Sequence, residues 1–84
     1  MTLRGQKLDL TPKEFQLLHF LLQNRRRAQS RERILESVWG YDYDGEDRVI
    51  NVTIQRLREK LEENPAQPRL ILTVRGLGYM YDVQ

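Results

Sequence analysis

The residues best equipped for chemistry in this chain stand close together, between positions 48 and 63. An arginine can bond guanine through two hydrogen bonds, a glutamine can bond adenine in the same way, and threonine or valine methyls can pack against the methyl of thymine. These types occur within one short stretch as Val52, Thr53, Gln55 and Arg56. They would supply the chemistry for reading base edges in a major groove, provided that one exposed surface presents them.

Hydrophobic spacing predicts that residues 48–63 form a helix with such a surface on its outside. At about 100° per residue, the apolar side chains fall in one narrow arc: Ile50, Ile54, Leu57 and Leu61. The opposite arc holds Arg48, Val52, Gln55 and Glu59, and one flank holds Val49, Thr53 and Arg56. Polar helix faces are commonly just solvated. Outward valines without an evident burial partner argue against that explanation here.

A turn near the C-terminus offers a second basic group. The β-branched run 70–74 and the alternating run 79–83 predict two strands, joined by the turn Arg75-Gly76-Leu77-Gly78. Glycines let a backbone approach a ligand closely, and arginine is attracted to the negative potential of a narrow minor groove. The pattern therefore predicts that Arg75 extends base reading into a minor groove.

A first helix is expected to begin at residue 12. Thr11-Pro12-Lys13-Glu14 has the pattern of a capping box with proline at the first helical position, and Asn24 is a suitable end. Leu10 and Phe15 are placed to close a hydrophobic staple at its start. Spacing predicts that the helix buries the side that carries Phe15, Leu17, Leu18, Leu21 and Leu22.

A second, shorter helix is expected over residues 31–39. Ser30 can cap it, and Gly40 can end it. Its apolar side would carry Ile34, Leu35, Val38 and Trp39.

Residues 27–29 could give a brief strand before this helix. Leu3, Leu8 and Leu10 around Gly5-Gln6 suggest a small hairpin at the start of the chain. Three helices and a terminal hairpin predict an α+β winged-helix domain, in which the third helix enters the major groove.

Composition limits the class of protein. With 84 residues, 39% hydrophobic and 31% charged, the chain has the size and make-up of a single globular domain, over residues 1–84. The net charge of +2 is too small to decide the partner, so the placement of the charges matters more. No segment has the apolar length of a membrane span or of a signal peptide, and a cytoplasmic protein without a membrane partner is expected.

The same composition offers little for catalysis or cofactors. Cysteine is absent, and His19 is the one histidine, so no thiolate or histidine metal site is expected. No nucleophile, base and acid fall in a recognisable constellation, and the glycine-bearing turn at residues 75–78 precedes a strand instead of a helix. We therefore expect no enzyme and no cofactor.

Five blocks, in this order, resemble the OmpR/PhoB-type effector domain of bacterial two-component response regulators. They are residues 10–15 (LTPKEF), 30–32 (SRE), 38–40 (VWG), 56–61 (RLREKL) and 73–79 (TVRGLGY). The resemblance runs from Leu3 to Val83 and implies a regulator of transcription that binds direct-repeat promoter half-sites. It also implies a receiver domain, absent from this chain, and a domain that is monomeric when isolated but forms a head-to-tail dimer on double-stranded DNA.

The resemblance also assigns roles to residues. The base-reading arginine falls on Arg56, and other groove-facing or groove-edge positions fall on Val49, Val52, Thr53 and Arg58. Phosphate contacts fall on Arg48, Trp39, Thr73 and Tyr79, and the minor-groove arginine falls on Arg75. The loop of Gly40, Tyr41, Asp42, Tyr43, Asp44, Gly45, Glu46 and Asp47 resembles the transactivation loop, which in some members contacts RNA polymerase.

Three departures from the family pattern affect these expectations. Gln55 stands where some relatives have a phosphate-binding arginine, and Thr53 stands where some have histidine, so the target sequence is expected to differ. The family's N-terminal four-stranded sheet would be represented only by its last strand pair, which suggests a truncated sheet.

A competing hypothesis treats the chain as a protein-interaction module. In it the acidic loop at residues 40–47 and the outward valines dock a partner such as RNA polymerase, and affinity for DNA is incidental. The run Arg25 to Arg27 could touch phosphate, although charge runs after helices are more often solvated.

Overall fold

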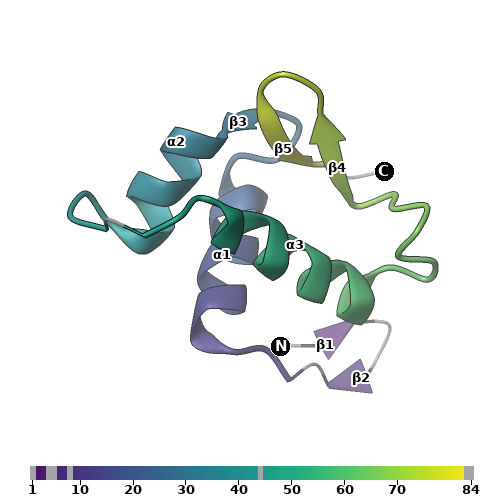
Figure 1. Ribbon diagram of the computed structural model, residues 1–84. Coiled ribbons are helices and arrows are strands. Elements are labelled where there is room, and N and C mark those ends of the chain that lie inside the picture. The colour runs from purple at the N-terminus through teal and green to yellow at the C-terminus, as the bar shows by residue number, and fades with distance from the viewer. Residues whose placement is uncertain (1, 4–5, 8, 44, 83–84) are drawn as a thin grey trace.

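The computed structural model describes residues 2–3, 6–7, 9–43 and 45–82. A short hairpin of β1 (Thr2–Leu3) and β2 (Gln6–Lys7) precedes the helix α1 (Pro12–Gln23). The strand β3 (Gln29–Ser30) leads into α2 (Arg31–Ile34) and the π-helical segment η1 (Leu35–Trp39). The helix α3 (Arg48–Leu61) and the strands β4 (Ile71–Val74) and β5 (Gly78–Tyr81) follow (Figure 1). This order confirms the predicted α+β winged helix.

The start of α1 is fixed as predicted. The Thr11 hydroxyl accepts from the Glu14 N–H at 3.2 Å, and the Glu14 carboxylate accepts from the Thr11 N–H at 3.1 Å, which completes the capping box. Asn24 caps the other end, where its side chain donates to the Phe20 carbonyl oxygen. These local contacts set both ends of the helix that supports α3.

The inward face of α1 differs from the prediction mainly at one residue. Leu17, Leu18 and Leu21 are buried as expected and Leu22 is partly buried against the core, but Phe15 is 46% exposed and its ring stacks on His19. Glu14 is buried instead, because its carboxylate accepts from Lys60 of α3 at 2.6 Å as well as from the cap. Hydrophobic spacing alone does not reveal a carboxylate that is paired in this way.

The second helix begins as predicted, because the Ser30 hydroxyl accepts from the Arg33 N–H at 3.1 Å. The helix then widens into η1 and ends at Gly40, whose φ of 105° suits a residue without a Cβ. The brief strand before it is Gln29–Ser30, so it starts two residues later than expected and ends one residue later. It starts there because Gln29 and Ser30 pair with Tyr79 and Gly78 of β5.

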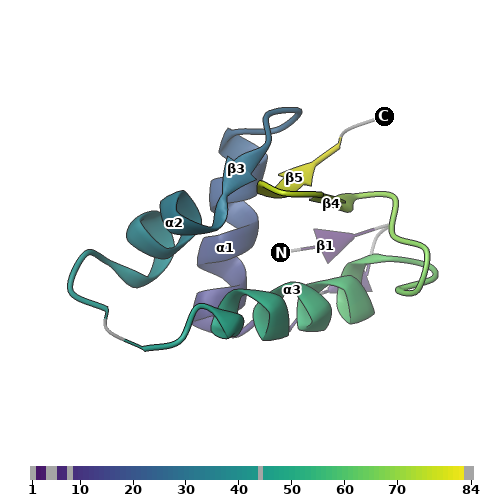
Figure 2. The ribbon, with the colours of Figure 1, turned by 45° about the horizontal axis from the view of Figure 1, so that its top comes forward.

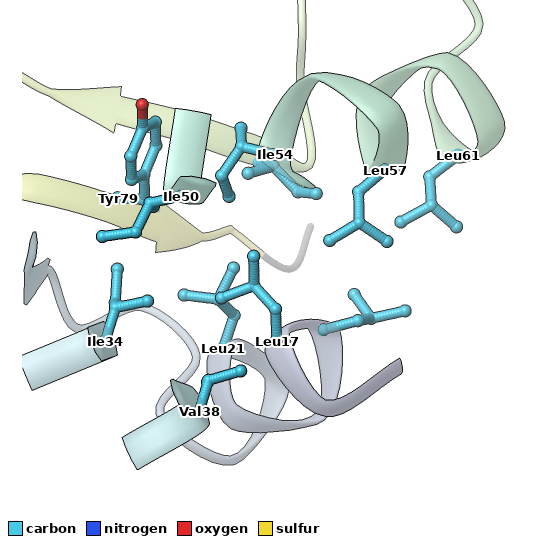
Figure 3. Packing of buried hydrophobic residues seen from close by; sticks show 11 residues of the cluster. Leu17, Leu21, Ile34, Val38, Ile50, Ile54, Leu57, Leu61 and Tyr79 are labelled. Carbon is cyan, nitrogen blue, oxygen red and sulfur yellow. The ribbon is translucent and has the colours of Figure 1, made fainter. Parts of the chain in front are cut away.

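The predicted core arc of α3 is confirmed. Ile50, Ile54, Leu57 and Leu61 are all buried, and they pack with the leucines of α1, with Ile34 and Val38, and with Tyr79 (Figure 3). Burying one such aliphatic side chain stabilises a fold by about 1.5 to 3 kcal/mol. The helix ends at Leu61, not Glu63, because the backbone of Glu62 is extended, with φ −86° and ψ 142°.

The wing forms a three-stranded sheet in the order β3-β5-β4, antiparallel throughout, with Thr73 opposite Tyr79. Gly76 takes a φ of 77° in the turn, and a Cβ on Gly78 would overlap the Gln29 carbonyl oxygen, so both glycines are required. The predicted N-terminal hairpin is present as the pair β1 and β2, while Leu8 lies outside the described residues. Within the described ranges, no helix is long and apolar enough to span a bilayer.

Candidate nucleic-acid interface

The outer face of α3 is open along its length. Figure 2 shows α3 along one side of the molecule, and the strands β3, β4 and β5 of the wing lie on the opposite side of this helix. Arg48, Val52, Gln55 and Glu59 are exposed there as predicted, and so is Arg56. Neither Gln55 nor Arg56 makes a side-chain hydrogen bond or ion pair within the part of the chain that the structure describes. Their donors are therefore available to a ligand.

A groove of about 350 Å³ joins this face to the start of α1. It brings together residues that are far apart in the sequence: Thr11, Lys13, Glu14, Trp39, Arg48, Val49, Val52, Thr53 and Arg56. Six of these are predicted site residues, and one of the six, Val49, is only half-buried. Lys13 was not predicted. Its ammonium donates to the Val38 carbonyl oxygen at 2.8 Å and lies 5.7 Å from the centre of the Trp39 ring, which adds a positive charge to the groove.

The groove presents Thr53 mainly through its methyl group. The Thr53 hydroxyl donates to the Val49 carbonyl oxygen at 2.8 Å, one helical turn earlier. Its proton is therefore committed to the helix backbone. Val52, which is 47% exposed, lies beside it and has only apolar surface to offer. The two side chains form an apolar strip between the basic groups Arg48 and Arg56.

The wing provides a second hollow, of about 470 Å³. Its lining combines the hairpin with the first residue of α2: Arg31, Thr73, Val74, Arg75, Gly76, Leu77, Gly78 and Tyr79. Arg75 is exposed at the hairpin turn, as predicted. The structure thus gathers Thr73, Arg75 and Tyr79 in this hollow and the other predicted contacts in the groove, with Gln55 and Arg58 in neither.

Arg58 points toward the wing and makes its contacts there. Its guanidinium donates to the Ile71 carbonyl oxygen and to the Thr73 hydroxyl, both at 2.9 Å from Nη2. Because Thr73 accepts this bond, its own hydroxyl hydrogen remains free for another acceptor. Thr73 therefore keeps a donor, while three of the five N–H donors of Arg58 are already used within the fold.

Tyr79 is only 7% exposed, and its hydroxyl donates to Asn51 Oδ1 at 2.7 Å. Asn51 Oδ1 also accepts from Arg31 Nη1 at 2.9 Å. Neither Asn51 nor Arg31 was singled out in the sequence. Their importance depends on the approach of the wing to the start of α3, for which neither hydrophobic spacing nor a local motif gives a signal.

The acidic loop at residues 40–47 lies at the end of the molecule away from β4 (Figure 1). Two of its carboxylates pair with neighbouring cations: Glu46 contacts Arg48 at 2.8 Å, and Asp47 contacts Arg31 at 3.3 Å. Tyr43 packs near Trp39 and donates to the Glu46 carbonyl oxygen, whereas Tyr41 is 88% exposed. Asp44 lies outside the described residues. The exposed pair of Arg48 with Glu46 is weak enough for a phosphate to replace.

Glu14 contributes little free negative charge to the groove. Burial raises the pKa of its carboxyl, but hydrogen bonds from Lys60 and the Thr11 N–H, together with the positive charges of Lys60 and Arg56, outweigh burial. The pKa therefore lies below its usual value, and Glu14 stays ionised and paired with Lys60. Arg56 keeps an exposed guanidinium beside this neutralised pair.

Comparisons with known proteins agree with this geometry. Residues 5–81 match the family model described as "Transcriptional regulatory protein, C terminal". The response regulator DrrB of Thermotoga maritima, an OmpR/PhoB homologue, is 36% identical with a TM-score of 0.88, over 96% of this chain and 36% of DrrB. The chain thus spans about a third of the length of that regulator.

Two isolated DNA-binding domains are also similar to this chain. The DNA-binding domain of Bacillus subtilis CssR is 38% identical with a TM-score of 0.79, over 93% of this chain and 84% of that one. The DNA-binding domain of Klebsiella pneumoniae RstA, solved in complex with the RstA box, is 36% identical with a TM-score of 0.82, over 93% of this chain and 77% of that one. This chain belongs to the family of C-terminal DNA-binding domains of OmpR/PhoB-type transcriptional regulators.

Proposed function

We propose that this chain binds promoter DNA sequence-specifically as the output domain of a two-component response regulator, and so regulates transcription. The observation that carries the proposal is the exposed face of α3, where Gln55 and Arg56 have free donors beside the apolar strip of Val52 and Thr53. Arg56 would bond guanine, Gln55 would bond adenine, and the methyl groups would contact thymine.

The other predicted contacts surround this face. Arg48, Trp39 and Thr73 would bind phosphates and so fix the position of the domain, because phosphate contacts carry no sequence information of their own. Arg75 would enter the adjacent minor groove. The RstA domain, which shares this fold, was solved in complex with the RstA box, and this likeness supports a DNA duplex as the ligand.

Selection from a pool of randomised duplexes tests this proposal. The domain should enrich one sequence pattern and bind it more tightly than a scrambled duplex of the same length and composition. Arg56→Ala should then relax the preference at a single base pair. Equal binding to the selected and scrambled duplexes would contradict sequence-specific recognition.

We further propose, from its family, which partners the full regulator has. A receiver domain would control the output domain in the bacterial cytoplasm. The output domain would be monomeric when isolated and would form a head-to-tail dimer on direct repeats. The loop at residues 40–47 would contact RNA polymerase, and Tyr41, exposed at 88%, favours this second interaction. In a transcription assay, Tyr41→Ala should reduce activation while binding to the selected duplex stays unchanged.

A further inference from the structure

The guanidinium of Arg58 connects α3 to the edge strand of the wing. Nε and Nη2 donate to the Ile71 carbonyl oxygen at 3.1 and 2.9 Å, and Nη2 also donates to the Thr73 hydroxyl at 2.9 Å. The guanidinium carbon lies 5.8 Å from the centre of the Tyr79 ring. These partners all belong to β4 or β5. Arg58 is half-buried, and these contacts use three of its five N–H donors.

Glu62 completes the connection one turn further along the chain. Its buried carboxylate accepts from the Ile71 N–H at 2.9 Å, and also from the N–H groups of Leu70 and Arg69. Glu62 and Arg58 therefore hold the N–H and the carbonyl oxygen of the same residue. β4 is an edge strand, and such strands leave one row of polar groups outside the ladder. At Ile71, side chains of α3 and its C-cap occupy that row.

A second contact lies about two helical turns away, toward the start of α3. There Asn51 accepts from the Tyr79 hydroxyl at 2.7 Å. Tyr79 stands opposite Thr73 in the sheet, so the two contacts reach the same part of the hairpin. Together they oppose sliding and rotation of the wing along α3.

We propose that Arg58 is a positioning residue, which fixes Arg75 and Thr73 relative to the base-reading face of α3 without touching DNA. This inference rests on the proposed function. A wing already held in place loses less conformational freedom on binding, so more of its contact energy appears as affinity. Arg58 also occupies the acceptor side of the Thr73 hydroxyl, which directs the hydroxyl hydrogen elsewhere.

A double-mutant cycle on the whole domain tests the proposal, with the duplex recovered by selection as the probe. Arg58→Met should lower affinity about tenfold, as the loss of one charge-assisted contact would. Arg69→Met is the matched control, because Arg69 is exposed in the next loop and its removal changes the net charge equally. In an Arg75→Ala background, the effect of Arg58→Met should shrink to about threefold, since only Thr73 is then left to position.

The alternatives give different results. If Arg58 touches a phosphate, Arg58→Met will cost the same factor in both backgrounds and lower the salt dependence by about one unit of slope, which would overturn the proposal. An unchanged affinity of the folded variant, despite a lower Tm, would also overturn it.

Arg58→Lys provides a rescue that separates charge from geometry. Lysine keeps the charge but lacks the planar fork that reaches two acceptors, so its affinity should fall between wild type and Arg58→Met. Full recovery would mean that charge alone matters and would contradict positioning. Failure of the wild-type domain to prefer any duplex would instead remove the proposed function, so the two failures can be told apart.

Discussion

Two faces of α3 use similar side chains for opposite purposes. On the outer face, Arg48, Gln55 and Arg56 face solvent, and Arg48 has only an exposed ion pair. On the sides turned toward the wing and toward α1, Arg58 and Lys60 are bound to backbone carbonyl oxygens and to Glu14. A count of the basic residues along the helix would therefore overestimate how many of them are available to bind a ligand. The comparison shows that a cation is available to a ligand only where the fold does not already use its donors.

The first way to sharpen this comparison is to test the buried side of the same helix. Leu57 is 0% exposed, and Leu57→Ala should lower the free energy of unfolding by about 2 to 5 kcal/mol through lost burial and a cavity. Val52→Ala, the matched control on the exposed face, should change it by less than about 0.5 kcal/mol. Urea unfolding followed by circular dichroism measures both. Equal losses would mean that the two faces are not divided as described.

The second prediction concerns the paired cation at the end of α3. Lys60→Met should destabilise the domain by about 1 to 3 kcal/mol, because the buried Glu14 carboxylate would lose its charged partner. Arg69→Met, at an exposed arginine, should have little effect. The measurement is again urea unfolding at neutral pH. A stable Lys60→Met variant would contradict a structural role for this cation.

The same pair predicts a pH dependence. The pKa of Glu14 is lowered in the folded state, so its stabilisation is present above the unfolded pKa of about 4.3. It is lost as the pH falls through the folded pKa. Stability should therefore decrease below about pH 4, and Glu14→Gln should show a smaller decrease over that range while being less stable at pH 7. Parallel curves for the two proteins would rule out this contribution.

The outer face of α3 should respond through binding instead of stability. Arg56→Ala should weaken binding to the selected duplex by about 1 to 3 kcal/mol and relax the preference at one base pair. Its thermal unfolding should stay close to that of the wild type, because the guanidinium makes no side-chain hydrogen bond within the described residues. Titration of duplexes altered at each position in turn measures the effect. A uniform loss at every position would instead assign Arg56 to phosphate binding.

Much of the fold could be predicted because its signals are local. The capping box at Thr11 and Glu14, the cap at Ser30 and the apolar arc of α3 each depend on residues a few positions apart. Phe15 was misplaced because helical spacing ranks a phenylalanine above a glutamate for burial. Helical spacing carries no information about Lys60, which is far away in the sequence. The bond from Lys60 to the Glu14 carboxylate makes burial of Glu14 favourable.

The candidate site was predictable to the extent that it depends on which face of α3 is outside. The predicted residues Arg48, Val49, Val52, Thr53 and Arg56 do line one groove. The sequence could not indicate that Thr53 uses its hydroxyl internally, that Tyr79 is bound to Asn51, or that Arg58 turns to Ile71. The contacts of Tyr79 and Arg58 depend on the angle between the wing and the helix, which is a tertiary property, whereas the Thr53 bond depends on which rotamer threonine adopts within the helix.

The smallest expected effect belongs to Arg48, the cation of the outer face that already has a partner in Glu46. Arg48→Ala should weaken binding to every duplex alike and lower the salt dependence by about one unit of slope, because one phosphate contact is lost. The loss of affinity should be smaller than for Arg56→Ala, because Arg48 must first leave Glu46, 2.8 Å away.

Glu46→Gln is the matching variant on the other side of this ion pair. It removes the charged partner of Arg48 and should strengthen binding slightly at low salt. A loss confined to one base pair in Arg48→Ala would show that Arg48 reads sequence, and the division between reading and holding residues at the start of α3 would have to be redrawn.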